Sequence, residues 1–184
     1  MRLEIRIAGF GGQGVVLAGY VLGKALALYS DREAVMTQSH GPEARGGASS
    51  ADLVVSTEPI AYPFVQQPDY LVALSQEAYT RFSPTIKPEA MVLIDQDLVN
   101  PRNGDQIHAI PATQLAEDLG RRIVTNVVML GFVTKLAGIV TPEAMVRALG
   151  DTLNPRILDL NIRAFNAGLE YQANQNKQPE AEKS

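Results

Sequence analysis

The residues whose types and spacing most clearly suggest a chemical function are the glycines of residues 9–14, which read Gly-Phe-Gly-Gly-Gln-Gly. An alternating apolar run at residues 3–7 precedes them, and a long apolar segment of helical period begins at Val15. A glycine turn between a buried strand and a helix leaves backbone N–H groups free to hold an anion. The candidate contacts are Gly11, Gly12, Gln13 and Gly14.

The same turn also satisfies the pattern Gly-x-Gly-x-x-Gly of a nicotinamide dinucleotide site, with Glu33 as the candidate ribose-binding acid. Glu33 lies at the start of its predicted strand, however, whereas the ribose acid normally lies at the end. A free-standing dehydrogenase also needs a hydride-site acid or base, and the sequence does not indicate one. A third interpretation is structural: the glycines only let the helix pack closely on the sheet.

A second glycine-rich segment, residues 39–47, has neither helical nor strand period and is predicted to be an ordered surface loop. Within it, Arg45 followed by Gly46 places a bidentate cation beside exposed backbone donors, which suits a phosphate or carboxylate. The alternative is a tight turn in which Arg45 pairs with Glu43. His40 is expected to be solvated or hydrogen-bonded within this loop.

Other chemistry has few candidates. The chain has no cysteine, which excludes disulfides, thiolate nucleophiles and cysteine-ligated iron–sulfur or zinc sites on it. His40 and His108 lack the spacing of a metal site, and His108 is expected to be a core or boundary residue. Asp95 and Asp97 follow an apolar strand, where α/β sites form, but such pairs are also common in turns. No catalytic residue and no metal ligand is therefore assigned.

Charge and hydropathy limit the partners and the location. The net charge is −4 and the basic residues are scattered, which argues against a nucleic-acid surface. No apolar run approaches the roughly 20 residues of a membrane span, and the N-terminus lacks a signal-peptide core. We therefore expect a cytoplasmic protein that binds neither nucleic acid nor membrane.

Strand and helix patterns alternate along the chain, which favours a three-layer α/β fold. The sheet is predicted to be mostly parallel with helices on both faces, Rossmann-like but without a standard dinucleotide site. One domain is expected over residues 1–173, followed by a disordered tail at 174–184. Predicted strands cover residues 3–7, 34–37, 49–56, 69–74, 90–95 and, as an edge strand before Pro111, 107–111. Predicted helices cover residues 15–27, 76–82, 113–119, 126–137, 142–149 and 155–172.

Three segments together resemble the gamma subunit of 2-oxoacid:ferredoxin oxidoreductases: residues 9–14, residues 39–47, which read Ser-His-Gly-Pro-Glu-Ala-Arg-Gly-Gly, and Pro68-Asp69. The similarity extends from Met1 to about Leu169. Each motif alone is weak, but the two glycine segments in this order and at this separation are fairly specific.

The resemblance implies a subunit of a thiamine-diphosphate enzyme that oxidatively decarboxylates a 2-oxoacid, reduces ferredoxin and forms an acyl-CoA. Thiamine diphosphate, magnesium and the iron–sulfur clusters are then expected on partner subunits (alpha, beta and a ferredoxin-like delta), and the isolated chain is expected to be inactive. The glycine turn becomes a candidate contact for the diphosphate of CoA. Arg45 and Gly46 become a second contact or part of the subunit interface.

The resemblance also indicates a branch of the family. The loop at 41–47, with Pro42, is similar to the 2-oxoglutarate and general 2-oxoacid (pyruvate-type) branch. The corresponding loop of indolepyruvate enzymes usually lacks this proline, so 2-oxoglutarate is the favoured substrate. An isolated subunit can self-associate through surface meant for its partners, and the apolar helices after Asn126 are the candidate surface.

Overall fold

A computed structural model describes residues 1–39 and 48–172. Residues 40–47 of the second glycine segment, with His40, Arg45 and Gly46, therefore lie outside the described residues, as does the predicted tail at 174–184. Six strands form one sheet in the order β2-β3-β1-β4-β5-β6. They are β1 (Arg2–Phe10), β2 (Glu33–Ser39), β3 (Ala48–Ser56), β4 (Tyr70–Ala73), β5 (Met91–Asp95) and β6 (Ile107–Ile110).

The sheet is mixed but mostly parallel, as predicted. The pairs β1–β4, β4–β5 and β5–β6 are parallel, whereas β3 pairs antiparallel with both β2 and β1. Strand β3 alone therefore runs against the other five. The sequence did not indicate this reversal, because a strand buried on both faces reads as the same apolar run in either direction.

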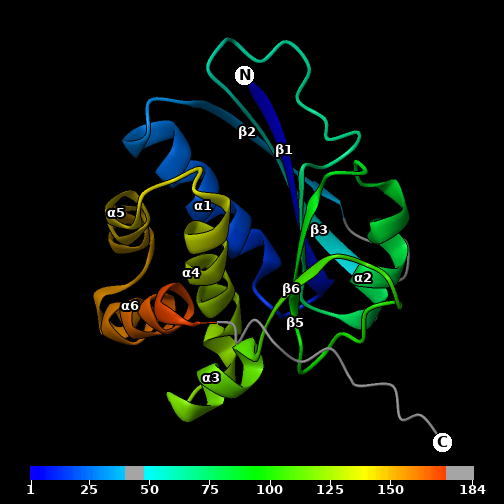
Figure 1. The fold of residues 1–184 in the computed structure, drawn as a ribbon. Helices are drawn as coiled ribbons and strands as arrows, with labels where there is room; N and C mark the ends of the chain where they lie inside the picture. The colour runs from blue at the N-terminus through cyan, green and yellow to red at the C-terminus, as the bar shows by residue number, and fades with distance from the viewer. Residues whose placement is uncertain (40–47, 173–184) are drawn as a thin grey trace, which may run out of the picture.

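Helices cover both faces of the sheet, which confirms the three layers (Figure 1). Helix α2 (Gln76–Phe82) lies on one face, where Tyr79 packs in a core with Ala8 and Leu71. The other face carries the larger core, which includes Ile5, Leu53 and helix residues from α1, α4, α5 and α6. The helices of that layer are α1 (Val15–Tyr29), α3 (Ala112–Asp118), α4 (Thr125–Ala137), α5 (Pro142–Thr152) and α6 (Pro155–Glu170), with short 3-10 helices η1 (Ser83–Thr85) and η2 (Arg122–Val124) completing the fold.

Local sequence signals explain several helix starts. The side chains of Thr141 and Asn154 accept hydrogen bonds from backbone N–H groups of α5 and α6, and each helix has proline at its first turn. Ser75 caps α2 in the same way. These starts agree with the predicted boundaries.

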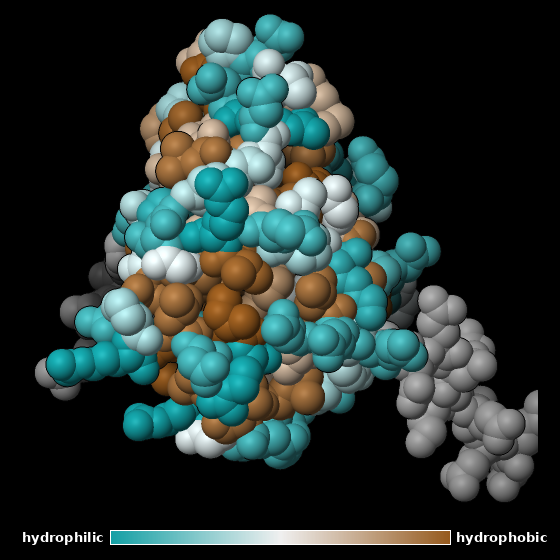
Figure 2. All heavy atoms as spheres, turned by 90° about the vertical axis from the view of Figure 1, so that its left-hand side faces the viewer, coloured by the Kyte–Doolittle hydropathy of each residue, from teal (hydrophilic) through white to brown (hydrophobic). Residues whose placement is uncertain are grey.

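Helix α4 is the centre of its layer, so the surface predicted on the apolar helices after Asn126 cannot include it. For α5 and α6 this surface stays a prediction. Residues 126–134 of α4 are all buried. A side chain at Gly131 would overlap the backbone of α6 at Phe165, and one at Gly168 would overlap the backbone of α4 at Val128. The apolar composition of α4 therefore serves the fold. Outside it, α5 and α6 expose Val146 and Ile157. The side of the molecule on which these helices lie shows hydrophobic patches among polar residues (Figure 2).

The predicted position of His108 was also wrong. The residue is exposed on β6, which is the edge strand that the sequence indicated. An edge strand has a neighbour on one side only, so its middle residues are less covered than those of the strands within the sheet.

Candidate functional site

The glycine turn follows β1 and leads directly into α1, as predicted. Gly12 and Gly14 have φ values of +92° and +70°, a region that other residues rarely adopt. Gly14 is the N-cap of α1, which has no side-chain cap. Its carbonyl accepts a hydrogen bond from Asn126 Nδ2 at 3.0 Å, and a Cβ at this position would overlap that amide. Gly14 therefore lets the starts of α1 and α4 meet.

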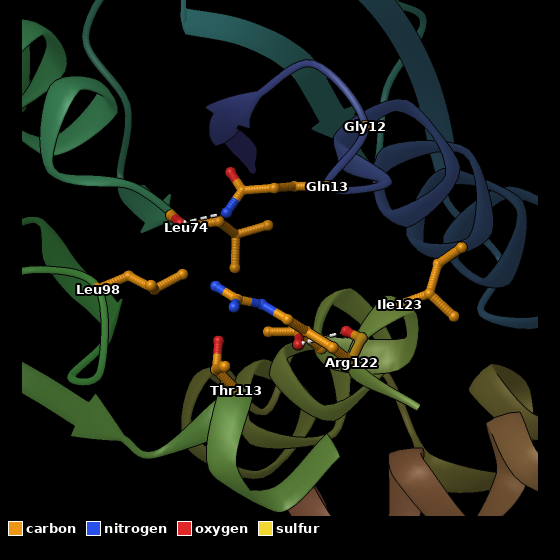
Figure 3. A pocket seen from close by; sticks show the side chains of 8 residues that line it. Gly12, Gln13, Leu74, Leu98, Thr113, Arg122 and Ile123 are labelled. Carbon is orange, nitrogen blue, oxygen red and sulfur yellow. Dashed lines mark hydrogen bonds between the residues drawn. The ribbon is translucent and has the colours of Figure 1, made fainter. Parts of the chain in front are cut away.

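The side chain of Gln13 is committed to the fold. Its Nε2 donates to the carbonyl of Leu74 at 2.8 Å, just after β4 (Figure 3). Its Oε1 accepts from the Phe10 N–H at 2.6 Å. The Gln13 amide thereby ties the turn to the end of the neighbouring strand. The Gln13 side chain therefore positions the turn.

Gly11 and Gly12 form the accessible part of the turn. Both are exposed, and no atom lies within 4 Å of the place where a Cβ would be at either residue. A bound group can therefore approach their backbone closely.

A cavity of about 270 Å³ lies beside the turn. It is lined by Gly12, Gln13, Leu74, Leu98, Thr113, Arg122, Ile123 and Thr125 (Figure 3). The chain leaves β1 into α1 on one face of the sheet and leaves β4 for α2 on the other face. The cavity thus lies at the point where the connections change face, outside the carboxyl ends of parallel strands, which is where α/β proteins bind ligands.

The electrostatics of this cavity favour an anion. Helices α1 and α4 both begin beside it, and helix N-termini carry partial positive charge. The guanidinium of Arg122 extends toward Gln13, Leu98 and Thr113 (Figure 3). Its side chain is 62% exposed, and its carboxylate neighbour, Glu117, lies at the long distance of 3.8 Å. The Arg122 cation is therefore available to a ligand.

Arg122 could not be predicted as a site residue from the sequence, because it lies 110 positions after Gly12. Only the packing of α4 against α1 brings the two together. The one local signal is its place just before a helix start, which is common for arginine on any surface.

Asp95, the carboxylate at the end of β5, has a structural position. It is fully buried, and it accepts hydrogen bonds from the Thr113 hydroxyl at 2.6 Å, from the Thr113 N–H at 3.1 Å and from the Asp97 N–H at 3.1 Å. Burial raises the pKa of Asp95 above its ordinary value, although the hydrogen bonds of Thr113 oppose the shift. Asp95 fixes the start of α3 on the sheet, and with it the cavity wall at Thr113. Asp97 accepts from the Gln114 N–H of the same helix at 2.9 Å.

The position of Glu33 argues against a nicotinamide site. Glu33 is the first residue of β2 and is exposed, whereas the end of β2 that lies nearest the glycine turn is Ser39. The Glu33 carboxylate therefore lies at the opposite end of the strands from the glycine turn. Within residues 1–39 and 48–172, no group of three or more histidine, aspartate or glutamate side chains could hold a metal ion. No helix in the same ranges could cross a membrane.

Fold and cavity together define an α/β domain with a crevice at the switch point of its sheet, and the electrostatics of this crevice favour an anion. Residues 4–171 match the model of the pyruvate ferredoxin/flavodoxin oxidoreductase family, and the chain belongs to that family. It is 49% identical, over 92% of its length and 94% of the relative, to 2-oxoglutarate synthase subunit KorC of Methanocaldococcus jannaschii. The resemblance seen in the sequence is thus confirmed.

Solved structures agree with this assignment. The gamma subunit of a keto/oxoacid ferredoxin oxidoreductase from Geobacter sulfurreducens matches with a TM-score of 0.84 and 39% identity, covering 92% of this chain and 95% of that chain. A 2-oxoglutarate:ferredoxin oxidoreductase from Magnetococcus marinus, solved with 2-oxoglutarate, coenzyme A and succinyl-CoA bound, matches with a TM-score of 0.80 and 25% identity. The match covers 91% of this chain but only 30% of that chain, so the relative carries this domain within a longer polypeptide.

Proposed function

We propose that this chain is the gamma subunit of a 2-oxoglutarate:ferredoxin oxidoreductase. The observation that carries the proposal is the 49% identity to a 2-oxoglutarate synthase subunit over nearly the full length of both chains. The complex would convert a 2-oxoacid to an acyl-CoA and pass the electrons to ferredoxin. Thiamine diphosphate, magnesium and the iron–sulfur clusters are proposed to lie on the alpha, beta and ferredoxin-like delta subunits, in the cytoplasm.

Within that complex, we propose that the cavity beside the glycine turn holds the diphosphate of CoA. Two negative charges there would face the start of α1, the open backbone of Gly11 and Gly12, and the Arg122 guanidinium. The Gln13 and Asn126 amides would keep these groups in place. Arg45 and Gly46 remain proposed as a second anion contact or as part of the subunit interface.

The size of the cavity limits what this chain can hold by itself. At about 270 Å³ it is smaller than the 300–1,000 Å³ typical of sites that bury a whole drug-sized ligand. The cavity would therefore take one section of CoA, and the rest would extend toward partner subunits. The role of this chain is to bind and orient CoA, which the reaction on the partner subunits then acylates.

Reconstitution of the complex with and without this chain tests the proposed function. We expect 2-oxoglutarate-dependent reduction of ferredoxin with formation of succinyl-CoA only when the chain is present, and lower turnover with pyruvate. The chain alone should show no turnover. Equal CoA-dependent turnover in its absence would contradict the proposal, and tight binding of NADH with no effect of CoA would favour the dehydrogenase alternative.

A further inference from the structure

A loop at the opposite end of β1 from the glycine turn exposes a continuous apolar segment. Residues 59–65, here called the aromatic loop, read Pro-Ile-Ala-Tyr-Pro-Phe-Val, and none of the seven is buried. The residues Tyr62 and Phe64 are 49% and 54% exposed, and their rings pack edge to face with centroids 5.5 Å apart. Exposed aromatic side chains in a contiguous apolar run are typical of a protein interface.

Two charged residues at the start of β1 hold the backbone of this loop. Arg2 donates to the carbonyls of Tyr62 and Phe64 at 2.8 and 3.2 Å. The buried carboxylate of Glu4 accepts from Arg2 at 2.9 Å and from the N–H groups of Gln66 and Gln67 at 2.7 and 3.0 Å. The backbone of the loop is thereby fixed at Tyr62 and Phe64, while both side chains stay about half exposed and can contact another molecule. Such pre-organisation lowers the entropy that binding costs.

A groove of about 540 Å³ lies next to the rings. It is lined by Arg2, Ser56, Pro59, Ile60, Ala61, Tyr62 and Gln66. The aromatic loop carries no charged side chain, and the charge of Arg2 is paired with Glu4. The surface therefore suits a partner that inserts apolar side chains.

The partner follows from the Magnetococcus relative, in which this domain accounts for 30% of a longer chain. There the rest of the polypeptide is covalently attached. In the complex proposed above, the counterpart of that rest is a separate subunit, which non-covalent contacts must hold. We propose that the aromatic loop is the docking surface for this larger subunit, an inference that rests on the proposed function.

The position of the loop is compatible with this role. Arg2 and Glu4 lie at the start of β1 and the glycine turn lies at its end. Nine residues of strand separate the two sites by roughly 26 Å. A subunit docked on the aromatic loop would therefore leave the proposed CoA contact unobstructed.

Other exposed apolar residues offer less. Val146 and Ile157, on α5 and α6, are single side chains with charged or polar neighbours in the sequence. Tyr20 and Leu28 on α1 line a smaller groove of about 250 Å³, together with Lys24. Tyr20, for example, has the Lys24 ammonium over its ring at 6.0 Å. Single exposed apolar residues of this kind are ordinary for a protein surface.

The test combines Tyr62→Ala and Phe64→Ala in one variant and measures its binding to the larger subunit in the reconstituted complex. Main-chain atoms make the hydrogen bonds of the loop, so the fold should persist, which an unchanged melting temperature would show. We expect the dissociation constant to rise at least about tenfold, because exposed aromatic anchors of this kind carry much of an interface energy. The control, Tyr20→Ala with Leu28→Ala, should bind as the wild type does.

A photo-crosslinking residue at position 64 of the wild-type complex identifies the occupant. Crosslinks to the larger subunit would support the inference, whereas crosslinks to a second copy of this chain, or none, would overturn it. Unchanged affinity of the aromatic double variant would overturn it as well. In either case a wild-type chain that still assembles and supports CoA-dependent turnover would leave the proposed function intact.

Discussion

At the residue scale, the glycine turn separates into residues that shape it and residues that are open to a ligand. Gly14 and Gln13 make contacts within the protein, to Asn126 and Leu74. Gly11 and Gly12 have open space where a side chain would be. Sequence spacing predicted all four as equal contacts, because hydrogen bonds to distant residues cannot be read from a local motif. Arg122 is the candidate contact that only the structure provides.

Replacing Arg122 with glutamine should weaken CoA binding through charge alone. We expect the KM for CoA of the reconstituted complex to rise roughly 3- to 10-fold, because a partly exposed cation is lost from the proposed anion site. The KM for 2-oxoglutarate should not change, and the salt dependence of CoA binding should become weaker. Arg163→Gln, on the exposed surface of α6, is the control. An unchanged KM for CoA would remove Arg122 from the site.

At the element scale, the order of strands and helices could be predicted well. All six strands and all six α-helices lie within a few residues of the predicted positions, because their apolar periods and caps are local signals. Two features could not be predicted. The reversed direction of β3 leaves no trace in a strand buried on both faces, and the central place of α4 depends on its contact with α6 through Gly131 and Gly168.

The buried Asp95, which joins β5 to α3, predicts a pH dependence of stability. Burial raises its pKa in the folded state above the ordinary value of 3.8, so between those two pKa values the folded protein holds a proton that the unfolded chain has released. The contribution of Asp95 to the free energy of unfolding must therefore fall as the pH rises through this window and stay constant above it.

Asp95→Asn does not titrate, so it should remove this pH dependence. It should also destabilise the protein at neutral pH, because one of the three hydrogen-bond donors around the carboxylate would meet an NH₂ group. Urea unfolding of both proteins from about pH 3 to about pH 7 measures the difference. A difference in the free energy of unfolding that stays constant across this range would show that Asp95 does not titrate as described.

At the scale of the whole molecule, the two proposed sites lie at opposite ends of the strands of one sheet. The anion cavity lies beyond the carboxyl ends of β1 and β4, and the aromatic loop lies beside the start of β1. Family membership could be inferred from two short glycine segments, since their order and separation are specific. The aromatic loop could not be predicted as a docking surface, because the exposure of residues 59–65 depends on how Arg2 and Glu4 hold the chain.

The central claim is that backbone groups of the glycine turn contact CoA, and Gly11→Val tests it most directly. The position has open space for the new side chain and needs no left-handed conformation, so the fold should be unaffected. Gly150→Val, at another open glycine, is the matched control. Equilibrium binding of CoA to the reconstituted complex should weaken at least about tenfold for Gly11→Val and not for the control, because the valine blocks approach to the backbone. Equal CoA affinity of Gly11→Val and wild type would contradict the account.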